Sequence, residues 1–552
     1  MSGVDGPAAA GSQPAGGWSP GGTELSVALV YPERYAIGMS NLGMHAALRA
    51  FRSAPGVRVE RAFWPGSSGI VEDDGFAGVA PEPAPADRFA GDAGRTLETE
   101  TPLSDFDVVA FSVSFEGDYF NLVRLLAAGG LEPLAADRGD DAPLVVVGGV
   151  CSQLNPAPIA PFVDAFLIGD ADALIPPLVT ALAGSEGAGA RSHEARSPDA
   201  SAREMRLARV RGIPGAYVPS LPPVEPVLPA AWAGGWVESL LVSPDAYFRD
   251  MYLMEISRGC GRGCRFCAAG ELQRPVRFRP VGEVIDAARR ALEVTSRVGL
   301  VSAALGDHPD IVAILEGMKA LGAEVNISSL RMEAITPRVA ALLADCGVRT
   351  ATIAPEAGDE DLRRSVGKGI SDDEVVAVAE RLASHGIERI RAYFMTGLPG
   401  SGCGEPAAVA ALCDRVRSAV AQHGARLAVS LSPFVPKPRT PLQWAAMAPE
   451  RDHRRAIADI RRRLARSGVS TTSAGPREAA QEAALARGGA DLAEAIRLVA
   501  LDGVPWKAAA RSAGVDLTRL VHREHDADEV FPWEVVDVGR GRQLLRRLYE
   551  SR

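Results

Sequence analysis

The sequence is poor in cysteine, lacks a long apolar run and has no excess of basic residues. Seven cysteines among 552 residues are too few for a disulfide scaffold, and their odd number speaks against complete pairing. No stretch approaches the roughly 18 consecutive apolar residues of a membrane-spanning helix, so we expect no membrane partner. Lysine and arginine number 59 against 69 aspartates and glutamates, and the resulting net charge of −10 disfavours a nucleic-acid partner.

Composition and length indicate a multidomain globular protein. With 47% hydrophobic and 23% charged residues, the chain resembles an average folded protein, and 552 residues suit about three domains. The start of the chain has no lysine or arginine before Arg34, unlike a secretory signal, so we expect a cytoplasmic protein. Changes in composition predict a disordered leader (1–24), a Rossmann-like domain (25–183), a flexible insert (184–206), an interdomain connection (207–250), a partial barrel (251–450) and a mostly helical C-terminal domain (451–552).

Short apolar runs alternate with helical patterns in residues 25–183. This alternation predicts an α/β fold with a doubly wound parallel sheet between two helical layers. Ligands of such sheets bind at the carboxyl ends of the strands, where small residues stand in this sequence. We predict that these residues border a pocket: Ser112, Ser114, Gly148, Gly149 and Gly169. The glycines also fit tight turns between strand and helix, and the absence of GxGxxG speaks against a dinucleotide site. The predicted strands are 25–31, 57–63, 108–113, 144–147 and 165–168, and the predicted helices include 42–53 and 119–128.

Further strand and helix patterns follow in residues 251–450. They predict an incomplete parallel barrel of six β/α units, whose site lies at the carboxyl ends of the strands. After residue 450 the patterns predict helices without strands, with arginines on a solvated face. The predicted barrel strands are 252–256, 299–304, 324–328, 350–354, 390–394 and 426–430.

Three of the seven cysteines lie within eight residues, as Cys260-x3-Cys264-x2-Cys267, directly after a predicted strand. Three neighbouring thiolates suit a soft metal centre. A structural zinc site needs a fourth protein ligand, and no second CxxC pair and no HxxxH pair exists in the sequence. Three ligands suit a [4Fe–4S] cluster with one iron open to a non-protein ligand. Zinc and redox roles remain the alternatives.

The CxxxCxxC spacing, with the aromatic Phe266 before the last cysteine, resembles the signature of the radical SAM superfamily. The resemblance implies that the open iron binds the amino and carboxylate groups of S-adenosylmethionine, and that Phe266 lies near the adenine. It also implies that an electron from the cluster cleaves the C–S bond of this cofactor and releases a 5′-deoxyadenosyl radical. A one-electron reductant such as flavodoxin or ferredoxin is then required.

Other stretches are similar to the superfamily's partial (β/α)6 barrel in order. Gly306 and Asp307, in ALGDHPD, occupy the place of a motif that contacts the methionine amino group, although the superfamily has Glu where Asp307 stands. The resemblance further implies ribose or carboxylate ligands, a basic residue of an Asn-Arg/Lys-Gly segment, and a glycine whose backbone meets adenine. The corresponding residues are Ser329, Arg331 and Glu356, then Lys368, then Gly397. No catalytic side chain is assigned beyond these.

The resemblance extends over residues 25–552, with segments such as VVVGGVCSQLNPAPIAPFVDAFLIGDAD and SPFVPKPRTPLQW. They are similar to radical SAM proteins with a flavodoxin-like, cobalamin-binding-type N-terminal domain and a C-terminal helical extension. The DxHxxG motif of histidine-ligated cobalamin is absent, and the histidine in residues 25–180 is His45. The resemblance implies a radical SAM enzyme, with cobalamin-dependent methylation or rearrangement of an unactivated carbon as the leading hypothesis. Hydrogen abstraction without cobalamin and a non-catalytic iron–sulfur sensor are the alternatives, and the substrate does not follow from the sequence.

Overall fold

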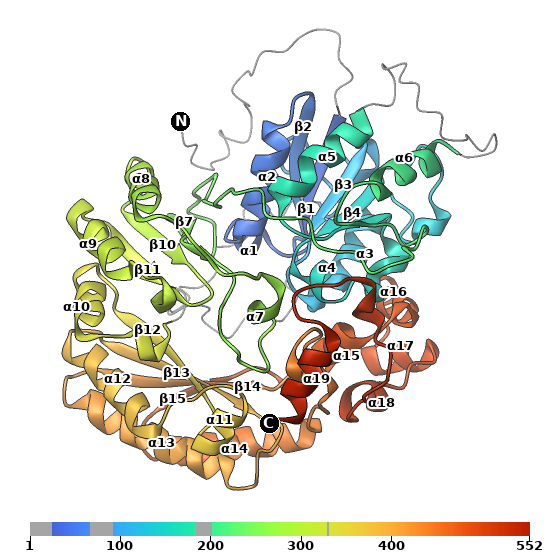
Figure 1. Ribbon diagram of the computed structural model, residues 1–552. Helices are drawn as coiled ribbons and strands as arrows, with labels where there is room; N and C mark the ends of the chain where they lie inside the picture. Colours follow the sequence, from blue (N-terminus) through green and yellow to red (C-terminus); the bar gives the residue numbers. More distant parts are fainter. Residues whose placement is uncertain (1–24, 67–91, 184–200, 328–329, 552) are drawn as a thin grey trace.

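Two α/β layers face each other in the chain, and helices of the C-terminal part lie beside both (Figure 1). The computed structural model describes residues 25–66, 92–183, 201–327 and 330–551. The predicted leader 1–24, the first part of the predicted insert and Ser329 lie outside the described residues. The α/β class predicted from the sequence is confirmed.

The N-terminal layer is a six-stranded sheet in the order β2-β1-β3-β4-β5-β6. Its strands are β1 (Leu25–Tyr31), β2 (Val57–Phe63), β3 (Val108–Ser112), β4 (Leu144–Gly148), β5 (Ala165–Leu167) and β6 (Ala216–Tyr217). The first five are parallel and β6 is antiparallel to β5, with Val27 in register with both Val59 and Val108. The strand order reverses direction between β1 and β3, so ligands are expected at the carboxyl ends of these strands.

Helices cover both faces of this sheet. One face packs against α2 (Leu42–Ser53), α5 (Ala171–Ala183) and α6 (Ala202–Arg211), and the other against α3 (Tyr119–Ala128) and α4 (Val150–Leu154). Alternate strand residues belong to the two cores: Val27 and Leu29 face α2, whereas Ala28 and Val30 face α3. Because both faces are buried, the central strands β3 and β4 are almost entirely apolar, whereas the edge strand β2 also carries charged residues. The remaining short elements here are α1 (Tyr35–Gly38), η2 (Leu103–Asp105), η3 (Glu116–Asp118), η4 (Ala135–Asp137) and η5 (Ala157–Phe162).

The predicted flexible insert is wrong for residues 201–206, because they begin α6. The Ser201 hydroxyl accepts a hydrogen bond from the Glu204 N–H, and the Glu204 carboxylate accepts one from the Ser201 N–H. This capping box satisfies two N–H groups of the first turn and defines where the helix starts. The strand β6 follows, so the N-terminal layer continues into the segment 207–250 that we assigned to the interdomain connection.

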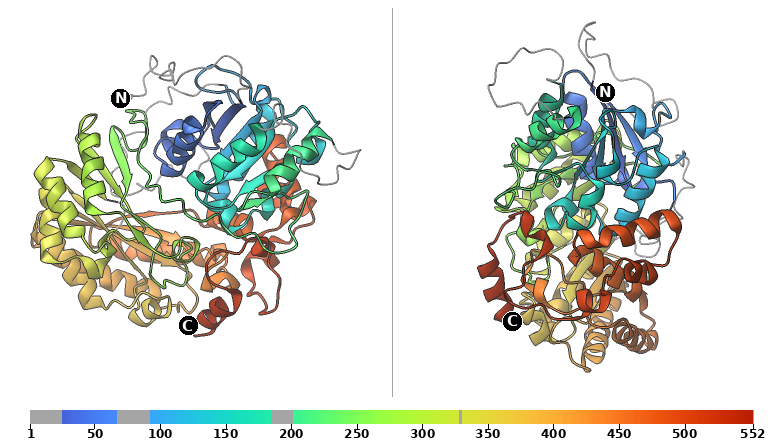
Figure 2. Two further views of the ribbon diagram at one scale, coloured as in Figure 1. Left: turned by 45° about the horizontal axis from the view of Figure 1, so that its top comes forward. Right: turned by 90° about the vertical axis from the view of Figure 1, so that its right-hand side faces the viewer.

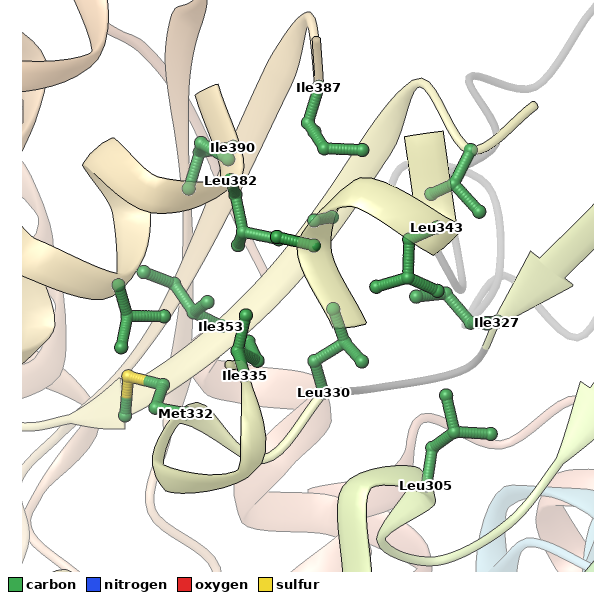
Figure 3. Close-up of a cluster of buried hydrophobic side chains, with 14 of the residues drawn as sticks. Leu305, Ile327, Leu330, Met332, Ile335, Leu343, Ile353, Leu382, Ile387 and Ile390 are labelled. Carbon is green, nitrogen blue, oxygen red and sulfur yellow. The ribbon is translucent and has the colours of Figure 1, made fainter. Parts of the chain in front are cut away.

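The second layer is a curved arrangement of two parallel sheets, β7-β10-β11 and β12-β13-β14-β15 (Figure 1). The strands are β7 (Met251–Glu255), β10 (Arg297–Val301), β11 (Glu324–Ile327), β12 (Thr350–Glu356), β13 (Arg389–Thr396), β14 (Arg426–Pro433) and β15 (Ser470–Ser473). The helices α8 (Val281–Leu292), α9 (Ile311–Leu321), α10 (Pro337–Asp345), α12 (Asp372–Ser384), α13 (Glu405–Ala421) and α14 (Glu450–Ala465) cover the outer, convex side. Figure 3 shows the apolar core between strands and helices, including Leu343, Ile353 and Leu382.

Short elements complete this layer at the carboxyl ends of its strands. They are β8 (Ser257–Arg258), α7 (Ala269–Leu272), β9 (Arg277–Phe278), η6 (Leu305–Asp307), η7 (Met332–Ala334), α11 (Glu360–Ser365) and η8 (Pro441–Trp444). The strand β8 pairs with β9 in a separate two-stranded sheet.

The region after residue 450 differs from the prediction in two ways. First, α14 packs on α13, and β15 pairs in parallel with β14, so the curved layer continues past residue 450. The four residues of β15, STTS, are polar and give no hydrophobic strand signal.

Second, the following helices share a core with the N-terminal sheet and are not a separate helical domain. The rings of Phe120 and Trp506 lie 5.8 Å apart, and the Asn155 amide donates to the carbonyls of Ala486 and Gly488. The elements of this shared core are α15 (Pro476–Arg487), η9 (Ala490–Leu492), α16 (Ala493–Asp502), α17 (Trp506–Ser512) and α18 (Leu517–His522). The last two elements, η10 (Pro532–Val535) and α19 (Arg542–Glu550), contribute to a separate cluster with Leu398 and Trp444 of the curved layer. Figure 2 shows these C-terminal elements beside both layers. Within the described ranges, no helix is both long enough and apolar enough to cross a membrane.

Candidate cofactor site

The loop that carries Cys260, Cys264 and Cys267 follows β8, at the carboxyl end of the first strand of the curved layer. All three thiols are free and partly accessible, whereas Cys151 and Cys413 are buried. Two main-chain hydrogen bonds tie the loop to its surroundings: the Arg265 N–H donates to the Val366 carbonyl, and the Arg265 carbonyl accepts from the Leu442 N–H, each at 3.0 Å.

Two glycines in left-handed conformations allow the loop to pack closely. Gly259 has φ +83°, and a Cβ there would lie 1.9 Å from the Gln273 carbonyl oxygen. Gly367 also has φ +83°, and its Cβ would lie 2.6 Å from the Gly263 carbonyl oxygen. A Cβ on Gly263 itself would meet nothing within 4 Å, so this part of the loop borders open space. Glycine is therefore required at 259 and 367.

Burial raises the pKa of the Cys264 thiol to about 11, although the Lys368 ammonium opposes this shift. Burial also raises the pKa of Cys267, and N–H groups of Ala269 and Gly270, which donate to the sulfur, oppose the shift. In the described ranges, no three His, Cys, Asp or Glu side chains converge on one point where a single metal ion could bind. Three thiolates of a [4Fe–4S] cluster bind three different irons, so they surround a cube rather than one ion. The donor set and the open space at Gly263 fit such a group.

Glu356 and Lys368 form an ion pair beside the cysteine loop, with Lys368 Nζ 3.2 Å from Glu356 Oε1. Glu356 ends β12 in the left-handed conformation, φ +72°, where the register with β13 shifts. Such a conformation is strained for a residue with a Cβ and is enriched at functional sites. Burial raises the pKa of Glu356, and Lys368 opposes this shift. A partner for the buried carboxylate thus exists within the chain itself.

A second ionic group lies on the other side of the loop. Arg262 makes a two-pronged contact with Asp307, Nε to Oδ2 at 2.9 Å and Nη2 to Oδ1 at 2.6 Å. Arg331 Nε lies 3.7 Å from Asp307 Oδ1, and Arg331 Nη2 donates to Glu333 at 2.5 Å. The structure therefore brings Asp307 and Arg331 together next to the cysteines. A ligand ammonium at Asp307 would share this carboxylate with Arg262.

The other predicted residues lie around the same loop. Phe266 packs at the edge of an apolar cluster that contains Leu398. Gly306 lies in η6, where a Cβ would be 2.4 Å from the Ala334 Cβ. Gly397 has φ +72°, and its Cβ would be 2.5 Å from the His453 ring. No structural account of Ser329 follows, because it lies outside the described residues.

A cleft of about 610 Å³ separates the carboxyl edge of the N-terminal sheet from the cysteine loop. All five residues that we predicted at the N-terminal strand ends line it: Ser112, Ser114, Gly148, Gly149 and Gly169. On the other side it is lined by barrel residues, including Ser257 and Gly259. These two residues also border a smaller cavity of about 220 Å³ that contains Cys260 and Asp307. Two large apolar side chains of the cleft, Phe115 (47% exposed) and Val150 (37% exposed), lack covering partners.

Arg258, directly before the cysteine loop, joins the two layers across this cleft. Its side chain is 5% exposed and donates to both oxygens of Glu255, at 2.6 and 2.5 Å. Its Nη1 lies 3.0 Å from Asp170 Oδ2, in the turn after β5. Arg258 was not among the site residues predicted from the sequence, and its position two residues before Cys260 is the one local signal that points to it.

Comparison with protein families matches two parts of the chain. Residues 86–219 match the family model described as "Radical SAM proteins, N-terminal", and residues 254–413 match "Radical SAM superfamily". An uncharacterized protein of Methanocaldococcus jannaschii is 24% identical over 351 residues, 62% of this chain and 70% of that protein. An uncharacterized protein of Methanopyrus kandleri is 26% identical over 164 residues, 26% of this chain and 31% of that protein.

Among solved structures, the cobalamin-dependent S-adenosylmethionine radical enzyme OxsB, with aqua-cobalamin and S-adenosylmethionine bound, is 14% identical with a TM-score of 0.41. The match covers 71% of this chain and 52% of OxsB. Coproporphyrinogen III oxidase from Escherichia coli, a radical SAM enzyme, is 16% identical with a TM-score of 0.30, over 40% of this chain and 52% of that protein. The chain thus spans about half the length of both enzymes.

Proposed function

We propose that the chain, which matches the radical SAM superfamily model over residues 254–413, is an enzyme of that superfamily that holds a [4Fe–4S] cluster on Cys260, Cys264 and Cys267 and cleaves S-adenosylmethionine reductively. We further propose that cobalamin binds in the cleft and that the enzyme methylates or rearranges an unactivated carbon. The observation that carries this proposal is the single cleft lined both by the N-terminal strand ends and by the residues that lead into the cysteine loop.

The cluster, when bound, supplies the electron that breaks the C–S bond of S-adenosylmethionine, and a donor such as flavodoxin or ferredoxin must replace that electron. The cysteine thiolates bind the three irons, and the N–H groups of Ala269 and Gly270 stabilise the charge on Cys267. Asp307 and Glu356 are the carboxylates available to the ammonium and hydroxyl groups of the cofactor. Each is already paired, with Arg262 or Lys368, so neither remains an uncompensated buried charge.

The residues that line the cleft favour the binding of a flat, partly apolar cofactor. Phe115 and Val150 offer uncovered apolar surface at the edge of the N-terminal sheet, where a large planar ring can exclude water. Cobalamin, when bound, supplies a methyl carrier between the S-adenosylmethionine site and the substrate. The small side chains of Ser112, Gly148 and Gly149 allow close approach to the strand ends.

If cobalamin binds in the cleft, we expect that His45 would not ligate its cobalt. His45 is buried, its Nδ1 accepts from the Leu240 N–H at 3.0 Å, and its Nε2 lies 3.0 Å from the Met39 carbonyl oxygen. Both ring nitrogens are therefore engaged by the main chain. The Co(II) form is expected to give an electron paramagnetic resonance spectrum without nitrogen splitting from the protein. A split spectrum that disappears in His45→Gln would contradict this part of the proposal.

A glycine at the cleft allows a sharp test. A Cβ on Gly148 would find no atom nearer than 3.9 Å, so Gly148→Leu places a side chain in the cleft without straining the backbone. After anaerobic reconstitution we expect the parent to retain stoichiometric cobalamin and Gly148→Leu to lose it, with iron and sulfide unchanged in both. Gly282→Leu is the matched control, because Gly282 lies in α8 with no atom within 4 Å of its Cβ and does not line the cleft.

Hydrogen abstraction without cobalamin is the second candidate. The sequence observation in its favour is the absent DxHxxG motif, with the N-terminal layer then serving as a substrate module. Reconstituted parent that cleaves S-adenosylmethionine but retains no cobalamin would establish this candidate over the first. Loss of cobalamin in Gly282→Leu as well as Gly148→Leu would remove the cleft as the binding site.

A further inference from the structure

A cavity of about 660 Å³ opens at the amino ends of β13, β14 and β15. The cysteine loop lies at the carboxyl ends of the strands, and an eight-residue strand such as β13 spans about 25 Å, so this cavity is remote from the cofactor site. It is lined by four arginines: Arg389, Arg391, Arg417 and Arg426. It lies outside the site proposed above and plays no part in it.

The strand register places two of these arginines side by side. Arg389 is the first residue of β13 and pairs in register with Arg426, the first residue of β14. The next residues on these strands, Ile390 and Leu427, are buried in the core under the outer helices. Because side chains alternate along a strand, Arg389 and Arg426 both start from the inner face. Neighbouring strands are about 4.8 Å apart, and like charges directly opposite each other destabilise a sheet.

The described residues that line the cavity include no aspartate or glutamate. Asp414 lies at the edge of the cavity, where it accepts from the Ser467 hydroxyl at 2.5 Å and lies 3.8 Å from Arg417, so Arg417 already has a carboxylate neighbour. Glu388 lies 3.7 Å from Arg349. Hydroxyl groups complete the lining. They belong to Ser430, Ser467, Ser470 and Thr472, and the Ser430 and Thr472 hydroxyls are 2.9 Å apart. The two guanidinium groups of Arg389 and Arg426, with these hydroxyls beside them, form a site that an anion would stabilise.

We propose that this cavity binds a small phosphate-bearing ligand, with Arg389 and Arg426 as its principal contacts. A guanidinium group presents two parallel N–H donors that match two phosphate oxygens, and two such groups in register match a diphosphate. The cavity volume lies within the range of small-molecule sites. The chain as a whole carries a net charge of −10, which favours a compact anion over a long nucleic acid.

Titration of the full-length protein with inorganic pyrophosphate, in chloride buffer of low ionic strength, tests the site by calorimetry. We expect saturable binding by the parent and a roughly tenfold or greater loss of affinity in Arg389→Gln and in Arg426→Gln, because each removes charged hydrogen bonds. Arg289→Gln is the matched control: this side chain is 61% exposed, lies in α8 and does not line the cavity. Its affinity for pyrophosphate should remain within a factor of about two of the parent.

Thermal unfolding gives a second readout, because a ligand that binds the folded state raises the melting temperature. Pyrophosphate should raise it in the parent and in Arg289→Gln, and not in Arg389→Gln. Absence of saturable binding by the parent would overturn the proposal, as would an equal loss of affinity in Arg289→Gln. A short single-stranded RNA that binds the parent more tightly than pyrophosphate, and loses affinity in Arg389→Gln, would overturn the assignment to a small ligand.

Discussion

The ion pairs of Arg258 predict a large stability cost when this side chain is shortened. Arg258→Gln removes two contacts to Glu255 and one to Asp170 and leaves two carboxylates that are only 12% and 22% exposed. Breaking a buried ion pair from one side typically costs about 3–5 kcal/mol. Asp170→Asn leaves the Arg258–Glu255 contact in place, so we expect a smaller cost of about 1–2 kcal/mol.

Urea denaturation of the full chain, followed by circular dichroism, measures these costs as changes in the free energy of unfolding. Arg289→Gln is the control, because Arg289 and its partner Asp286 are 61% and 62% exposed, and we expect a change within about 0.5 kcal/mol. The double variant Arg258→Gln/Asp170→Asn should cost less than the sum of the single variants, since both remove the same contact between the layers.

The functional consequence should appear at the cysteine loop, two residues after Arg258. Reconstituted Arg258→Gln should hold less iron than Arg289→Gln, because the start of the loop loses its anchor to the N-terminal layer. The reasoning is refuted if Arg258→Gln unfolds within about 0.5 kcal/mol of the parent, the range of ordinary surface changes. Strict additivity in the double variant would show that the contact between Arg258 and Asp170 has no coupling free energy.

Three further outcomes follow from other parts of the site. Cys264→Ala should abolish the incorporation of iron and sulfide on reconstitution, whereas Cys403→Ala, at an exposed thiol, should leave the iron and sulfide contents unchanged. Full iron content in Cys264→Ala would disprove the ligand role of Cys264. Gly397→Ala should lower the free energy of unfolding by about 2–4 kcal/mol, because it combines a left-handed φ with a Cβ 2.5 Å from the His453 ring. The control Gly402→Ala places its Cβ in open space and should cost under about 1 kcal/mol in the same denaturation assay. Burial lowers the pKa of His453 below its usual 6.5, so the contribution of this histidine to stability is present above pH 6.5 and is lost as the pH falls below that value. His453→Gln should therefore flatten the dependence of the free energy of unfolding on pH between about 5 and 7. An unchanged slope would contradict this assignment.

The cysteine motif and the strand positions were predictable because they are local. Apolar runs of four or five residues marked β1, β3 and β4, since a strand buried on both faces has to be largely apolar. The polar strand β15 and the capped start of α6 were missed because neither depends on a hydrophobic pattern. Hydrogen bonds to the neighbouring strand β14 hold β15 in place, and the capping box holds the first turn of α6.

Partners across the fold were not predictable, because they join residues far apart in the sequence. The resemblance assigned Glu356 a role in holding the cofactor, and the structure places Lys368 of the next loop against it. Asp307 likewise meets Arg262, 45 residues earlier in the sequence. A buried carboxylate is stable only with a polar or charged partner, but the sequence does not show which cationic side chain lies next to it.

The sequence by itself determined that this chain carries a three-cysteine loop at the end of a strand, within an α/β protein of alternating buried strands and helices. Spacing and periodicity carry that information, because they act within a few residues. Only the tertiary structure decided that the carboxyl edge of the N-terminal sheet faces the cysteine loop across one cleft, and that the C-terminal helices complete the core of the N-terminal layer. These arrangements depend on which apolar faces and charges are complementary in space, and complementarity between distant segments leaves no local pattern in the chain.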